Sequence, residues 1–233
     1  MKINKKRMIK DFMKLVKIDS LSGREKNISL YLKKVLEKMG AKVSFDNAGK
    51  KTKGNTGNLI AKFKGTRKGK PFILSAHMDT VEPGENIKPI LKSDRITSDG
   101  STILGADCKS GIVIILEVIR VLQENKLPYP PIEVVFTVSE EVGLLGAKFL
   151  DYSKVKGKYG MIFDSERVLN QVTAYAPAAN KIEIEVYGKA AHAGVAPESG
   201  ISAIKVAANA ISKMKLGRID FETTANIGMI NGG

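Results

Sequence analysis

The stretch Pro71-Phe-Ile-Leu-Ser-Ala-His77-Met-Asp79-Thr80 decides the fold that this sequence predicts. Its first six residues carry no charge, and its apolar residues are consecutive, which is typical of a strand buried in a parallel sheet covered by helices. Function in such sheets lies at the carboxyl ends of the strands. Because side chains on an extended segment repeat every two residues, His77 and Asp79 are predicted to point to the same side just beyond that end. One of these two side chains can bind a metal ion while the other orients the metal-binding side chain. Taken alone, the pair is equally compatible with a core histidine beside a turn aspartate.

Asp107 is a second candidate, in the glycine-flanked sequence that follows a Pro/Gly-rich loop or hairpin over 80–101. An apolar helix is predicted over 112–122, which places Asp107 near the start of that helix. A carboxylate is favoured there by the helix dipole and by free backbone N–H groups. As an alternative, Asp107 is an ordinary helix cap. The neighbouring glycines favour close approach of the backbone to another group.

Three more carboxylates follow predicted strands. The β-branched run over 132–138 predicts a central strand that ends at Glu140 and Glu141, and a short strand over 160–163 ends at Asp164. Adjacent carboxylates repel each other and favour a divalent cation as a partner, although a solvated turn is the simpler alternative. Together these positions supply the ligands that a pair of hydrolytic metal ions requires. The candidate residues are His77, Asp79, Asp107, Glu140, Glu141 and Asp164.

The remaining patterns predict an α/β fold, with a mostly parallel mixed sheet and helices on both faces. A capping box at Ser22 and Glu25 is expected to open the second helix. The Gly/Lys-rich stretch over 48–57 is expected to be a mobile loop. The other elements expected before the central strand are helices over 7–17 and 22–40 and strands over 41–45 and 58–63.

The pattern changes after residue 176. Strict alternation over 181–187 predicts a half-exposed antiparallel strand, Ser199 is expected to cap a helix, and another strand is expected over 225–230. These patterns divide the chain into a metal-binding domain over 1–176 and a small α+β lid or dimerisation domain over 177–233, which is incomplete.

Composition narrows the class of protein. The chain has 233 residues, 43% of them hydrophobic, and a net charge of +14. Lysine far outnumbers arginine and no nucleic-acid-binding signature accompanies the charge, so a solvated lysine-rich surface is favoured over a nucleic-acid interface. No apolar run is long enough for a membrane span and no signal peptide is visible. The single Cys108 is typical of a reducing compartment, so the cytoplasm is expected.

The motifs together resemble the dinuclear-zinc metallopeptidases that include peptidase T, glutamate carboxypeptidase, aminoacylase, acetylornithine deacetylase and succinyl-diaminopimelate desuccinylase. They occur in the family's order, and those around His77 and Glu140 are most similar to the peptidase T branch. The matching motifs are SAHMDTV (75–81), GADCKSG (105–111), SEEVGLLGA (139–147), FDSE (163–166) and GKAAHAG (188–194).

The resemblance implies two Zn²⁺ ions per complete subunit, replaceable in vitro by Co²⁺ or Mn²⁺, and an amide hydrolase. By resemblance, His192 reaches a partner subunit's active site and binds substrate there, which implies a homodimer; as an alternative, it is an ordinary loop histidine. The resemblance also implies that His77 and Asp164 bind one zinc, that Glu141 binds the second, and that Asp107 bridges the two. It further implies that Asp79 orients His77 and that Glu140 is the general base.

The sequence departs from the family at two points. Cys108 follows Asp107 where the family usually has a second aspartate, and we expect it to be a bystander rather than an extra ligand. The family's last zinc ligand is a histidine further along a longer chain, whereas this chain has only two histidines. We therefore expect the N-terminal part of an enzyme, which alone binds one zinc and turns over poorly or not at all.

The expected reaction is cleavage of short peptides by a peptidase T-like aminopeptidase. An N-acyl amino-acid deacylase of the same family is the alternative. From a different class, the alternative is a non-catalytic protein that binds a metal or, through its basic surface, nucleic acid.

Overall fold

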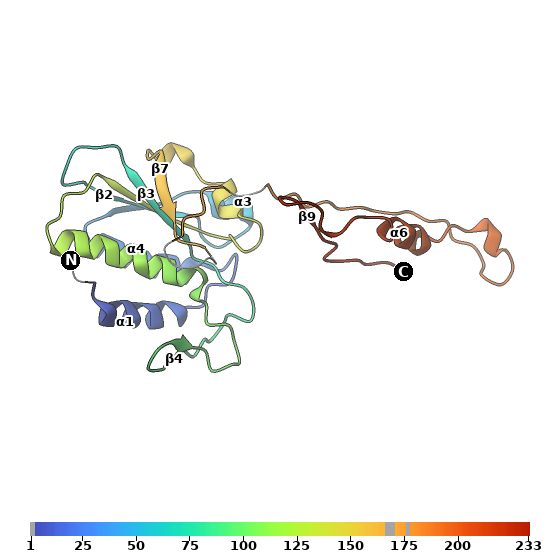
Figure 1. Ribbon diagram of the computed structural model, residues 1–233, viewed down its shortest axis with the longest axis horizontal. Coiled ribbons are helices and arrows are strands. Elements are labelled where there is room, and N and C mark those ends of the chain that lie inside the picture. The colour runs from blue at the N-terminus through green and yellow to red at the C-terminus, as the bar shows by residue number, and fades with distance from the viewer. Residues whose placement is uncertain (1–2, 166–170, 176–177) are drawn as a thin grey trace. The chain divides into compact units, whose positions relative to one another are not determined.

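The computed structural model describes residues 3–165, 171–175 and 178–233 (Figure 1). The chain divides into two units, Met1–Arg167 and Val168–Gly233. The domain boundary predicted at 176/177 lies outside the described residues.

The first unit is built on a five-stranded sheet with the order β1-β2-β6-β3-β7. β3 pairs in parallel with β6 and β7, whereas β2 is antiparallel to both β1 and β6, so β2 alone runs against the other four. The predicted mixed, mostly parallel sheet of an α/β protein is confirmed. The strands are β1 (Lys42–Phe45), β2 (Leu59–Phe63), β3 (Phe72–His77), β6 (Ile132–Thr137) and β7 (Tyr159–Ile162).

The apolar runs form the centre of this sheet. Every residue of β6 is buried, and Leu74 and Ala76 of β3 lie beside Val134 and Phe136 of β6 in the parallel register. These four side chains share one face, because side chains two residues apart point the same way. They belong to a single hydrophobic core with apolar residues of the helices.

Helices cover the face of the sheet that carries these four side chains, and the helices also pack against one another (Figure 1). An ion pair between Arg7 and the almost fully buried Glu117, 2.7 Å long, ties α1 to α4. On the opposite face, buried Glu133 accepts hydrogen bonds of 2.8 Å from the backbone N–H groups of Lys156 and Gly157. None of the described helices is long and apolar enough to cross a membrane. The helices of the first unit are α1 (Lys5–Val16), α2 (Lys26–Lys38), α3 (Ala48–Thr52), α4 (Ala106–Glu124), α5 (Leu145–Lys148) and the 3-10 turn η1 (Tyr152–Lys154).

Two predictions for this unit are corrected. The stretch over 48–57 is not simply a loop, because its first five residues form α3. The predicted capping box is wrong: Glu25 immediately precedes α2, but no side-chain hydrogen bond caps the helix there. The stretch over 80–101 contains the expected hairpin, whose strands are β4 (Ile90–Leu91) and β5 (Ile96–Thr97).

The second unit contains short elements and, among its described residues, no buried side chain. The strand predicted over 181–187 is absent from these described residues, and the strand predicted over 225–230 is reduced to β9. The helix begins after Ser202, whose side chain accepts from the Lys205 N–H, and not after Ser199. The missing strand over 181–187 indicates that an alternating pattern does not form a strand without a hydrogen-bonded neighbour. The elements are η2 (Pro197–Ser199), α6 (Ala203–Ile211), β8 (Gly217–Arg218) and β9 (Thr224–Ala225).

Candidate active site

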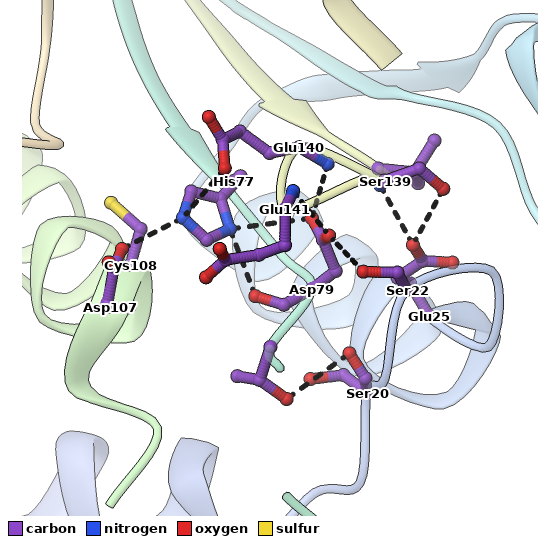
Figure 2. Close-up of polar contacts among 12 residues, drawn as sticks. Ser20, Ser22, Glu25, His77, Asp79, Asp107, Cys108, Ser139, Glu140 and Glu141 are labelled. Atoms are coloured by element: carbon purple, nitrogen blue, oxygen red, sulfur yellow. Dashed lines mark hydrogen bonds and ion pairs between the residues drawn. The ribbon is translucent and has the colours of Figure 1, made fainter. Parts of the chain in front are cut away.

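His77 is the last residue of β3 and is 2% exposed. Its Nδ1 lies 2.9 Å from the backbone carbonyl oxygen of Asp79 (Figure 2). A carbonyl oxygen can only accept, so Nδ1 carries the proton in this contact. Nε2 points the other way and lies 2.9 Å from Oδ1 of Asp107. The ring is therefore oriented so that Nε2 can bind a cation.

The Asp79 carboxylate is fully buried and organises the loop after β6 (Figure 2). It accepts hydrogen bonds from the Ser22 hydroxyl at 2.7 Å and from the backbone N–H groups of Glu140 at 3.0 Å and Glu141 at 3.1 Å. Its Oδ1 lies 3.4 Å from Nδ1 of His77, which is an electrostatic contact, since the ring's hydrogen bond goes to the main chain. Asp79 thus joins the end of β3 to the segment that carries the two glutamates.

Asp107 lies just before the first regular turn of α4. It and Cys108 have non-helical backbone dihedrals, and the peptide bond between them is cis. The Asp107 side chain contacts the imidazole of His77, and the alternative that it also caps the helix stays a prediction. The buried Cys108 thiol donates to the carbonyl oxygen of Phe163, which connects this turn to the residue after β7.

The remaining predicted carboxylates lie around the same imidazole. Oε2 of Glu140 is 3.9 Å and Oδ1 of Asp164 is 3.7 Å from Nε2 of His77. Potential ligand atoms of His77, Asp107, Cys108 and Asp164 all lie within 4.8 Å of one another, and so do those of His77, Glu140 and Glu141. Histidine nitrogen and carboxylate oxygen are ligands suited to a divalent cation such as Zn²⁺, so these residues fit a metal centre.

The charges of the site shift its pKa values. Burial acts to lower the pKa of His77, but the carboxylates of Asp79, Asp107 and Asp164 outweigh it and raise that pKa to about 9. Burial raises the pKa values of Glu140, Glu141 and Asp164, with repulsion between the carboxylates adding to the effect. Protons are therefore held more tightly than usual at these groups, and a bound cation must displace them.

Two residues that the sequence analysis did not single out support the loop after β6. The Asn58 side chain accepts from the Val138 N–H at 3.1 Å and donates to the Gly146 carbonyl and to the Asp46 carboxylate, both at 2.8 Å. Asp46 also accepts from the Asp151 N–H at 3.1 Å. No sequence signal identifies these roles, because most of the partners are backbone groups far away in the chain. Glu25, which the sequence analysis named only as part of a capping box, also supports this loop, because it accepts from the Ser139 N–H.

His192 lies in the second unit, where its Nδ1 accepts from the Gly194 N–H at 3.2 Å. Its predicted role at a partner's site stays a prediction.

Comparison with known proteins identifies related chains. Residues 58–213 match the model of peptidase family M28. The protein YqjE of Bacillus subtilis is 45% identical over 231 residues, which are 99% of this chain and 62% of that protein. Carboxypeptidase G2 of a Pseudomonas species is 30% identical over 88% of this chain and 50% of its own length. Peptidase T of Escherichia coli is 36% identical over 51% of this chain and 29% of its own length.

Solved structures agree with these matches. A tripeptidase from Staphylococcus aureus superposes with a TM-score of 0.84 at 40% identity, and the aminopeptidase PepT from Bacillus cereus with 0.81 at 42% identity. In both cases the match covers 99% of this chain and 62% of the other. The resemblance to the metallopeptidases that include peptidase T is thus confirmed, with the chain spanning less than two thirds of these relatives. The chain belongs to peptidase family M28.

Proposed function

We propose that this chain is part of a zinc-dependent exopeptidase that removes residues from short peptides, as a peptidase T-like aminopeptidase does. The observation that carries the proposal is the imidazole of His77, whose Nε2 faces carboxylates from three separate segments. The likeness to a tripeptidase and to an aminopeptidase supports the substrate class.

In this proposal the two groups around His77 hold two Zn²⁺ ions. His77 and Asp164 would hold one ion, Glu141 would hold the other, and Asp107 would serve as a ligand to both. Asp107 is suited to bridging because its side chain is 61% exposed and faces Nε2. Cys108 stays outside the ligand set, because its thiol proton is donated to a backbone carbonyl and burial raises its pKa to about 12.

Glu140 is the proposed general base. When bound, the cations polarise the amide carbonyl and make water a nucleophile near neutral pH. Glu140 takes a proton from the attacking water and delivers it to the nitrogen of the leaving amine. Its side chain is about a quarter exposed, so it can reach a substrate, and its raised pKa brings it nearer to the working pH of a proton shuttle.

Further parts of the proposal come from the resemblance. His192 steadies the oxyanion in the active site of a partner subunit, so the working form is a homodimer. The free Cys108 supports a cytoplasmic location, where thiols stay reduced.

The adjacent residues Glu140 and Glu141 provide a matched test. Glu140→Ala should retain metal and lose cleavage, whereas Glu141→Ala should remove the second metal ion, which only the extended chain is expected to bind. Metal content is measured by elemental analysis in the 233-residue chain and in a chain extended to the length of the Bacillus subtilis relative, where the extension should add one ion. Cleavage of tripeptides and N-acyl amino acids is measured in the extended chain. The proposal is wrong if wild type binds no zinc, or if Glu140→Ala cleaves tripeptides like wild type.

A further inference from the structure

Glu25 is a fully buried carboxylate near the candidate site that the proposed reaction does not use. It precedes α2, but its side chain turns toward the loop after β6 (Figure 2). Its Oε1 accepts hydrogen bonds from the backbone N–H groups of Gly23 at 2.8 Å and Ser139 at 2.9 Å, and from the Ser139 hydroxyl at 3.3 Å. Its Oε2 has no partner among the described residues. A carboxylate is costly to bury unless it is hydrogen-bonded, so these contacts are what hold Oε1 in place, and they tie it to Ser139.

That segment is Ser139, which directly precedes the two functional glutamates. Ser139 has a φ of +51°, in the left-handed region that residues other than glycine rarely adopt. Such a conformation persists only where surrounding contacts enforce it. Of the backbone groups nearby, the Val138 N–H is held by Asn58, and those of Glu140 and Glu141 are held by Asp79. Glu25 holds the residue between them, where the chain turns.

We propose that Glu25 is a positioning residue for the metal centre: by holding Ser139 in its left-handed conformation, it aims Glu140 and Glu141 at the cations. The inference rests on the proposed function, which gives those two residues their roles. Ser22 belongs to the same short segment and donates to Asp79. Residues 22–25 therefore hold two segments in place, because Ser22 binds Asp79 just after β3 and Glu25 binds Ser139 just after β6.

The test measures binding of the second Zn²⁺ ion, the one assigned to Glu141, and backbone dynamics in a chain extended to the length of the Bacillus subtilis relative, with Glu25→Ala as the main variant and Glu25→Gln as its conservative counterpart. Glutamine keeps one oxygen that can accept from Ser139, whereas alanine keeps none. We expect Glu25→Ala to bind Zn²⁺ about tenfold or more weakly, as is typical when a supporting partner of a metal ligand is removed. We also expect the amide protons of residues 139–141 to exchange faster, and Glu25→Gln to restore most of both properties.

Glu133→Ala is the matched control. Glu133 is also a buried glutamate that accepts from two backbone N–H groups, but it lies near the opposite end of β6 from the site. The Glu133→Ala variant should have a lower melting temperature, but its zinc affinity and the amide exchange of residues 139–141 should not change. An equal loss of zinc affinity in Glu133→Ala would show that the effect is general destabilisation, and would overturn the inference.

The other outcomes are also decisive. If Glu25→Ala binds zinc like wild type and its amides at 139–141 remain protected, Glu25 positions nothing. If Glu25→Ala does not fold, Glu25→Asp replaces it: the charge stays before α2, but the carboxylate is one methylene short of Ser139, and unchanged zinc affinity would overturn the inference. If wild type itself binds no zinc, the proposed function fails, and the amide exchange of residues 139–141 still decides whether Glu25 holds the turn.

Discussion

Replacing Asp79 by asparagine should destabilise the protein and weaken metal binding together. The Asp79 carboxylate is fully buried and accepts from Ser22, Glu140 and Glu141. In Asp79→Asn one oxygen becomes an NH₂ group, which can only donate. The Ser22 hydroxyl can rotate and accept from this group, but a backbone N–H of Glu140 or Glu141 cannot.

One buried N–H is therefore left without an acceptor, at a cost of about 1–3 kcal/mol. The attraction between Asp79 and His77, whose Nδ1 lies 3.4 Å from Oδ1, is lost as well. We expect the free energy of unfolding of the metal-free protein to fall by about 3 kcal/mol in total, as measured by urea denaturation at pH 7. Zinc affinity, measured by calorimetry, should fall about 10- to 100-fold, because the loop carrying Glu140 and Glu141 loses an anchor.

Asp94→Asn is the control for loss of one negative charge. The Asp94 side chain is 67% exposed, so this variant should change the free energy of unfolding by less than about 0.5 kcal/mol. If Asp79→Asn also stays within that range and binds zinc like wild type, then Asp79 does not organise the site as the structure indicates.

Three further changes test other parts of the structure. Cys108→Ala should leave zinc affinity within about threefold of wild type, since the thiol donates to a backbone carbonyl; a loss of about tenfold in titrations would make the thiol a ligand. Gly146→Ala should cost about 3 kcal/mol in urea unfolding, because a Cβ there would lie 2.0 Å from the Val138 carbonyl oxygen; a near-neutral result would contradict this packing. Arg7→Ala should cost about 2 kcal/mol at pH 7, because buried Glu117 loses its 2.7 Å ion pair and keeps the Asn4 N–H at 2.8 Å and Arg120 at 4.0 Å. Burial acts to raise the pKa of Glu117, but the hydrogen bonds from Arg7 and Asn4 and the charges of Arg7 and Arg120 together outweigh burial and lower that pKa below its ordinary 4.5. The pair therefore stabilises the protein above about pH 4.5, and the difference between wild type and Arg7→Ala should shrink as the pH falls further through the folded-state pKa; a difference that is the same at pH 7 and pH 3 would count against it.

Much of the first unit could be predicted from local patterns. The consecutive apolar residues of β3 and β6 indicated buried parallel strands, and buried parallel strands end at one edge of a sheet. This is why residues at or just beyond the ends of those strands, such as His77 and Glu140, could be expected to meet. The structure brings their side chains to 3.9 Å.

The supports of the site could not be predicted in the same way. Ser22 and Glu25 have the spacing of a capping box, but the Glu25 side chain accepts from Ser139, which is 114 positions away in the chain. Asn58 likewise holds Val138 across 80 positions. A sequence pattern describes neighbours within one element, and these contacts depend on how separate elements pack. The strand predicted over 181–187 failed for a related reason: alternation specifies two faces, but only a neighbouring strand supplies hydrogen bonds.

The residues that support the site share one feature, which is that an acidic side chain accepts hydrogen bonds from the main chain. Asp79, Glu25 and Asp46 accept mostly from backbone N–H groups, which every residue except proline supplies. The hydrogen bonds from the main chain therefore do not depend on the identity of the donor residue, whereas they do depend on the three acidic acceptors. A saturation mutagenesis scan should find these three acidic positions as intolerant as catalytic ones, although none of them needs to touch a substrate.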